Sequence, residues 1–223
     1  MFSGHIGVAF AAKRATPRVS LATLVLAAQW LDVLWPIFLL LGVEHVRIDP
    51  GRTRLTPLDF YDYPWTHSAV IAAAWGVAFG AVHFALKRSV RAAAWLGALV
   101  FSHWALDFVT HVRDLPLWPG GPRVGLGLWN APAAEAVLEA FIYLGGAAIY
   151  FRATRARDRA GRWGAWTFAA LIPLIHLAST AGPPPPSVAT LAWSAAVLPW
   201  PLLLFAWWID RHRETVVRAT PRP

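Results

Sequence analysis

The sequence predicts an all-α fold: an integral membrane bundle of about six transmembrane helices plus a short N-terminal helix. Hydrophobic residues make up 57% of the 223 residues and charged residues only 14%, whereas soluble domains carry about 25% charged residues. The apolar residues gather into runs near the length, about 20 residues, that a helix needs to cross the hydrocarbon core. Tryptophan, with 14 copies, recurs near the ends of these runs, as is typical of residues at the membrane–water interface.

The first element in the chain is a short segment, residues 2–12, that is apolar apart from Ser3 and His5. It is too short to cross a bilayer and too hydrophobic for a solvated tail. We expect either a short helix tucked into the bundle, with Lys13 and Arg14 ending it at the headgroups, or an amphipathic segment at the interface.

The spans follow from the apolar runs and from the breaks between them. Prolines concentrate in 44–66, 113–131 and 183–186, and proline ends helices. The predicted spans are 20–43, 67–86, 92–112, 132–151, 163–181 and 188–209.

Lysine and arginine gather in four segments, near 13–18, 87–91, 152–162 and 211–222. In a six-span model all four fall on one side, which the positive-inside rule assigns to the cytoplasm. We therefore expect a multi-pass protein of the cell (inner) membrane with both termini cytoplasmic. The net charge of +8 then reflects orientation, and no nucleic-acid partner is expected. Because cysteine is absent, disulfides and thiolate metal sites are excluded.

Ionisable residues inside the spans are the clearest functional signal, because each is unfavourable in lipid unless it is paired or binds a metal. In the third span, His103, Asp107 and His111 recur every four residues and so share one face of a helix. Two imidazoles around a carboxylate suit zinc or manganese. The alternative is a polar seam that packs against other helices.

Depth along the helices points to the same layer of the membrane. Counted at about 1.5 Å per residue, mid-membrane holds Asp32, His103 and Glu139, and the half away from the basic segments holds His67, Asp107, His111 and Glu135. Helical bundles build carboxylate–histidine metal sites in such cores. We expect His83 and His176 to be hydrogen-bonded interior histidines, and Asp62 either to contact substrate or to serve a turn.

Four short motifs stand in order along the first two thirds of the chain: Ser3-Gly4-His5, Gln29-Trp30-Leu31-Asp32, Tyr63-Pro64-Trp65-Thr66-His67-Ser68, and Ser-His-x-x-x-Asp at Ser102, His103 and Asp107. Over roughly residues 1–145 the chain thereby resembles the YdjM-like family of predicted membrane-bound metal-dependent hydrolases. The ligand order is also similar to that of zinc-dependent phospholipase C and single-strand nucleases.

The resemblance implies a set of metal ligands: His5, Asp32, His67, His103 and Asp107. It also implies that Asp107 is able to bridge two ions, with His111 and Glu139 as candidates for a further position. The soluble phospholipases carry a later His-x-x-x-Glu pair, whereas no histidine stands four residues before Glu135 or Glu139 here.

The sequence therefore favours a membrane-embedded metal-dependent hydrolase of a phosphoester or lipid-linked substrate, with membrane lipid as its partner. It would use one or two divalent ions, zinc or manganese. The candidate catalytic carboxylates are Asp107, Glu135 and Glu139, and the candidate substrate contacts are Arg113, Arg123 and Asp62. The runner-up is a metal-ion or proton transporter that uses the same buried layer. We interpret 1–223 as one domain with a metal-site core at about 1–145, a helix pair at 163–209 and a basic tail at 210–223.

Overall fold

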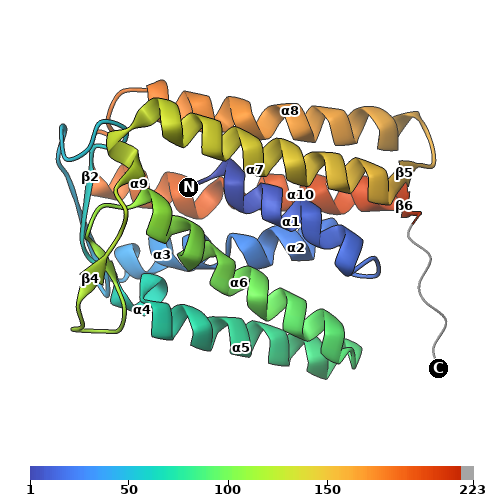
Figure 1. The fold of residues 1–223 in the computed structure, drawn as a ribbon, viewed down its shortest axis with the longest axis horizontal. Coiled ribbons are helices and arrows are strands. Elements are labelled where there is room, and N and C mark those ends of the chain that lie inside the picture. The colour runs from blue at the N-terminus through green and yellow to red at the C-terminus, as the bar shows by residue number, and fades with distance from the viewer. Residues whose placement is uncertain (217–223) are drawn as a thin grey trace.

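The computed structural model describes residues 1–216, so Arg218 and Arg222 of the predicted basic tail lie outside the described residues. The predicted all-α membrane bundle is confirmed. Long helices run side by side, and short antiparallel strand pairs lie at the two ends of the bundle (Figure 1).

The helices, in chain order, are α1 (Ser3–Ala15), α2 (Leu21–Ala28), α3 (Trp30–Leu40), α4 (Pro64–His67), α5 (Ala69–Lys87), α6 (Val90–Thr110), η1 (Leu128–Asn130), α7 (Pro132–Ala153), α8 (Arg159–Ala181), α9 (Val188–Val197) and α10 (Pro199–Arg211). The strand pairs are β1 (His45–Ile48) with β2 (Leu58–Asp62), β3 (Leu115–Pro116) with β4 (Arg123–Val124), and β5 (Thr154–Ala156) with β6 (Arg213–Thr215).

Five stretches of the described chain are long and apolar enough to cross a membrane: α5, α6, α7, α8 and the consecutive helices α9 and α10; α2 and α3 together make a sixth. Their outward faces carry large apolar side chains, and Val77 and Phe141 are 74% and 76% exposed. Histidine and carboxylate side chains are buried inside instead. Apolar residues outside and ionisable residues inside are typical of a helical membrane protein.

Two predicted spans are bent or interrupted where the sequence predicted single helices. Span 20–43 is α2 followed by α3, bent by 57°. Span 188–209 is α9 followed by α10, which begins at Pro199 because proline cannot continue a hydrogen-bonded helix. At the first break the carbonyl oxygen of Ala28 accepts a hydrogen bond from His103, and a buried partner of this kind makes irregular backbone tolerable at membrane depth.

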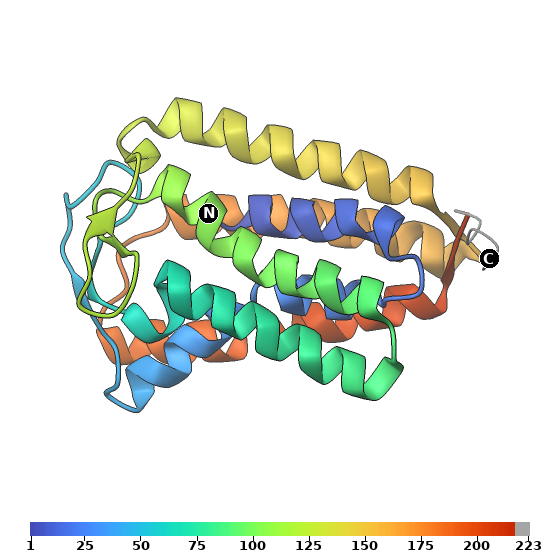
Figure 2. The same cartoon turned by 60° about the horizontal axis from the view of Figure 1, so that its bottom comes forward.

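Helix α1 lies inside the bundle (Figure 2). Ile6 and Phe10 are each 1% exposed, so the alternative of an interfacial segment is wrong. The helix packs against α7 because glycines let the two backbones touch: a Cβ at Gly7 would lie 2.7 Å from the Ile142 carbonyl oxygen, and one at Gly146 would overlap the Gly7 carbonyl. This packing sets the first turn of α1 beside α6 and α7.

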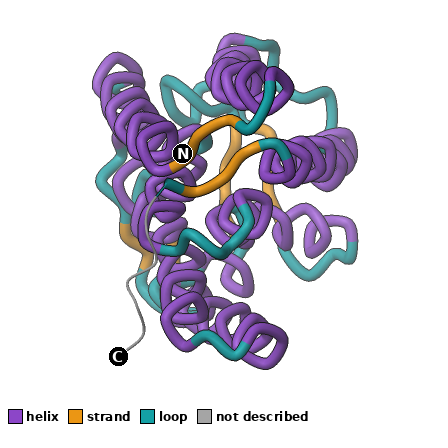
Figure 3. The backbone as a smooth tube through the Cα atoms, turned by 90° about the vertical axis from the view of Figure 1, so that its right-hand side faces the viewer, coloured by secondary structure: helices purple, strands orange, loops and turns teal. Residues whose placement is uncertain are grey.

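The two ends of the bundle differ in their connections. The loop end contains residues 41–63, 111–131 and 182–187, and the basic end contains residues 13–20, 87–91, 153–159 and 211–216. Figure 3 views the bundle from the basic end, where β5 and β6 pair. The described parts of the four basic segments thus lie at one end of the bundle, as the six-span model required.

Candidate metal centre

The centre is built around His103 and Asp107, which lie one turn apart on α6 and are 1% and 2% exposed. The carbonyl oxygen of Ala28 lies 2.8 Å from His103 Nδ1. Because a carbonyl oxygen can only accept, Nδ1 carries the proton and donates it. His103 Nε2 therefore faces the carboxylates, at 3.1 Å from Asp107 Oδ2 and 3.5 Å from Asp32 Oδ1.

His67, at the end of α4, is oriented by a second chain of hydrogen bonds. The Thr66 hydroxyl donates to Glu44 Oε2 at 2.7 Å, so its oxygen is left to accept from His67 Nδ1, also at 2.7 Å. His67 Nε2 then faces Asp32 Oδ1 at 3.5 Å and Asp107 Oδ2 at 3.9 Å. Such an outer partner sets the ring orientation of a metal-binding histidine.

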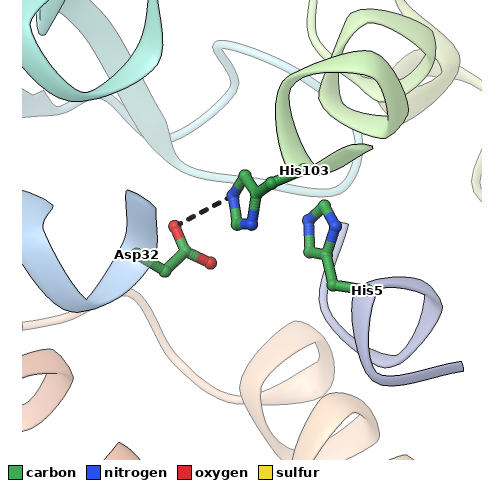
Figure 4. Close-up of side chains that lie close together, drawn as sticks. All are labelled: His5, Asp32 and His103. Carbon is green, nitrogen blue, oxygen red and sulfur yellow. Dashed lines mark ion pairs between the residues drawn. The ribbon is translucent and has the colours of Figure 1, made fainter. Parts of the chain in front are cut away.

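His5 and Asp32 reach the centre from α1 and α3 (Figure 4). His5 Nε2 lies 3.2 Å from Asp107 Oδ1, and the His5 ring stacks on His103 with centroids 3.7 Å apart. His5 Nδ1 is buried and has no hydrogen-bond partner among the described residues. The amino group of Met1 also lies 3.0 Å from Asp107 Oδ1.

These contacts create two overlapping groups of ligand atoms, each with its atoms within 4.8 Å of one another. The groups are His5–Asp32–His103 and His67–His103–Asp107. We call these five residues the His/Asp centre. All five residues that the resemblance implied are therefore brought together, although His5 precedes the first span.

A further group joins Glu135 and Glu139, one turn apart on α7, to His176 on α8, again with ligand atoms within 4.8 Å. Glu139 accepts hydrogen bonds from the backbone nitrogens of Phe2 (2.8 Å) and Gly4 (2.7 Å) and from the Ser3 hydroxyl. It therefore anchors the first turn of α1. We call these three residues the Glu/His group.

A cavity of about 500 Å³ touches both sets of residues and extends to the loop end. Its wall includes Asp32, His67 and Asp107 of the His/Asp centre and all three residues of the Glu/His group. The remaining wall is largely aromatic and proline-rich, with Trp35, Phe60, Tyr63, Trp129 and 183–185. Asp32 has a side chain 38% exposed, so the centre is open on the cavity side.

His111 leaves the stripe that the sequence predicted, because α6 ends at Thr110 and His111 is extended, with ψ 148°. Its Nδ1 lies 2.9 Å from Asp114 Oδ1 and 3.2 Å from the Tyr63 hydroxyl. Burial and the neighbouring Asp114 hold the pKa of Tyr63 well above its ordinary value. His111 thus lines the cavity but belongs to neither group of ligand atoms.

The predicted substrate contacts lie elsewhere. Asp62 pairs with His45 at 2.8 Å on the exposed β1–β2 hairpin, Arg123 donates to the Tyr61 carbonyl, and Arg113 is exposed. None of the three predicted contacts lines the cavity, whereas Arg54 does.

Sequence reasoning missed three residues: Arg54, Thr66 and Glu44. Thr66 is next to His67 in the sequence, which is a usable signal, but nothing local pairs it with Glu44. Glu44 is 1% exposed and also accepts from the backbone nitrogens of Trp65 and Thr66. Burial raises the pKa of Glu44, against the opposing effect of the hydrogen bonds from Thr66.

The donor set of the His/Asp centre, imidazole nitrogens with carboxylate oxygens, could hold a metal ion. The unpartnered His5 Nδ1 and the outer hydrogen bonds of His67 and His103 fit that use. Fold and site together define a helical membrane protein with a buried histidine–carboxylate centre. No family model, curated protein or solved structure matches this chain.

Proposed function

We propose that this protein is a membrane-embedded, metal-dependent hydrolase of a phosphoester, acting on a lipid-linked substrate. The observation that carries the proposal is the His/Asp centre at the wall of a cavity, with Asp32 exposed to the cavity. A catalytic metal site needs protein ligands on one side and an open position on the other. The resemblance of the motifs to membrane-bound hydrolases points the same way.

The chain's own residues would perform distinct tasks. A divalent ion, zinc or manganese, would polarise a phosphoryl oxygen and lower the pKa of a water molecule. Asp107 turns Oδ1 towards His5 and Oδ2 towards His103, so it would serve one ion or, as the resemblance implies, bridge two. The Glu44–Thr66 chain would keep His67 Nε2 directed at the cavity.

Arg54 is the basic side chain that we propose for the substrate phosphate. It lines the cavity, and it takes no part in the ion pairs that hold Arg47 and Arg52 to Asp59. Guanidinium groups bind phosphate oxygens through paired hydrogen bonds. The aromatic part of the cavity wall would accept an apolar portion of the same substrate.

The packing beyond the centre favours hydrolysis over transport. Further along α1, Phe10 packs against Tyr143, Tyr150 and Phe168 in the buried core. A transport route to the basic end would need polar steps through this cluster.

Hydrolysis is tested with purified protein in mild detergent, using a chromogenic phosphodiester and a lipid phosphomonoester as probes. We expect activity that a chelator removes, that zinc or manganese restores, and that His103→Ala lacks. Arg54→Gln should raise KM, while Arg52→Gln, from the same loop but outside the cavity wall, should match wild type. Metal uptake into proteoliposomes without any hydrolysis would instead establish a transporter.

We also propose that the basic end faces the cytoplasm and that the cavity opens on the opposite side. The chain has no cysteine, so single cysteines can be introduced cleanly. In intact cells Arg157→Cys should react only with permeant thiol reagents, and Ser187→Cys should react with impermeant ones. The reverse pattern would invert this orientation.

A further inference from the structure

The Glu/His group shares no residue with the His/Asp centre but lines the same cavity. We infer that Glu135, Glu139 and His176 form a second divalent-metal position. The inference deepens the proposed function, on which it rests for the role of the second ion: a substrate in the cavity would meet metal from two walls.

One carboxylate of the group is unsatisfied. Glu135 is 1% exposed, and its Oε1 has no hydrogen-bond partner among the described residues. Glu139, 2% exposed, lies one turn along the same face of α7. Two carboxylates buried side by side are unfavourable unless a proton or a cation lies between them.

Among the described residues, no lysine or arginine forms an ion pair with either glutamate. Among the described ion pairs, Glu139 faces only His176, and Glu135 appears in none. The nearby Met1 amino group is paired with Asp107, and Arg54 forms no ion pair with either glutamate. A bound cation, like a shared proton, would relieve the repulsion between the two carboxylates, and the imidazole of His176 beside them favours the cation.

The acceptor positions that remain free converge on one place. Glu139 Oε2 accepts from Gly4 N and the Ser3 hydroxyl, whereas Oε1 accepts only from Phe2 N. A carboxylate oxygen has two lone pairs, so Glu139 Oε1 keeps one, and this oxygen lies 4.0 Å from His176 Nδ1. Glu135, Glu139 and His176 thus each offer one ligand atom.

An imidazole in the set favours a transition metal or zinc over calcium or magnesium, which prefer ligands that are all oxygen. His176 comes from α8, which is outside the stretch that carries the family-like motifs, so no local spacing links it to the two glutamates. Glu135, expected from the sequence to be catalytic, and Glu139, expected either to be catalytic or to hold a further metal position, would both act here as ligands.

The test counts metal per chain. Apo protein is loaded with Mn²⁺ or Zn²⁺, desalted and measured by elemental analysis, for wild type, Glu135→Gln and His176→Asn. We expect each variant to hold one equivalent less than wild type, while thermal unfolding shows that both still fold. His83→Asn, on α5 and outside every ligand group, should keep the wild-type count.

The outcomes separate this inference from the proposed function. Equal metal counts in wild type, Glu135→Gln and His176→Asn, with a lower count in His103→Ala, would overturn the second position and leave the His/Asp centre standing. Wild-type protein that stays free of metal would overturn both. Loss of one equivalent in His176→Asn alone would support the position if Glu135→Gln failed to fold.

Discussion

The half of the bundle near the basic end and the half near the loop end both bury ionisable side chains, but the two halves differ in the partners of these side chains. Near the basic end, Lys13 Nζ donates to the Val19 carbonyl at 2.7 Å and pairs with Asp210 at 3.1 Å. Arg213 likewise donates to Thr154 and to the Gly161 carbonyl. In this half each buried cation meets its acceptors within the chain.

Near the loop end, some buried polar atoms of ionisable side chains have no hydrogen-bond partner among the described residues. Among residues 1–216, His5 Nδ1 and Glu135 Oε1 are buried without hydrogen-bond partners, and the groups they belong to converge on a cavity. Buried polar atoms are nearly always paired, so unpaired ones need an explanation. Near the basic end the unpaired buried atom of the described chain is the neutral Tyr150 hydroxyl, and the charges there hold helices together. The difference supports the proposal that the ionisable groups around the cavity bind a ligand.

The largest effect should come from breaking the His/Asp centre. His103→Ala removes a ligand that both groups share, so we expect most of the metal at this centre to be lost. Chelation should lower the unfolding temperature of wild type, because a ligand at 100 times its Kd stabilises by about 2.7 kcal/mol. The same treatment should have much less effect on His103→Ala. The control, His83→Ala, should behave as wild type, and unchanged occupancy in His103→Ala would place the site elsewhere.

A smaller effect is expected from the hydroxyl behind His67. Thr66→Val removes the link between His67 Nδ1 and Glu44, and loss of such an outer hydrogen bond weakens metal affinity by about 10–100-fold. Metal titration measures the change. Thr16→Val is the matched control, because Thr16 is also buried, near the basic end, and its hydroxyl donates to the Ala12 carbonyl. Equal affinities in the two variants would contradict a role for the Glu44–Thr66–His67 chain.

A substitution near the basic end should lower stability without any loss of metal, which would sharpen the contrast between the two halves. Lys13→Met leaves one oxygen of Asp210 and the Val19 carbonyl without their donor, and an unsatisfied buried group costs about 1–3 kcal/mol. We expect a lower unfolding temperature with an unchanged metal count. A parallel loss of metal would show that the two halves are coupled.

The smallest effect concerns the surface of the basic end. Asp158 caps α8 through Gly161 N and faces His212 Nδ1 at 2.7 Å, and its pKa is lowered by the hydrogen bond from His212. A lowered pKa contributes stability above the ordinary value of 3.8 and loses it as pH falls through the folded value. Asp158→Asn keeps the cap but removes the charge.

Its unfolding temperature should therefore lie slightly below wild type at neutral pH and match it in strong acid. Thermal unfolding measured from neutral to strongly acidic pH follows the difference. A gap that widened in acid would contradict this assignment.

How much could be predicted from the sequence is clear from particular residues. Apolar run length placed α5, α6, α7 and α8 within a few residues of their observed ends, and a spacing of four put His103 and Asp107 on one face of α6. The same spacing failed for His111, because a turn after Thr110 redirects its backbone.

The sequence by itself determined the membrane bundle, the clustering of basic residues at one end and the residue types of the centre. Those features depend on local hydropathy and helical periodicity, which can be read along the chain. Only the tertiary structure decided the bend after Ala28, the burial of α1 against Gly146, the Glu44–Thr66–His67 chain and the meeting of His176 with Glu139. Each of these depends on side chains that come from separate helices and fit together only when the bundle packs, and no periodicity within one helix encodes such a contact.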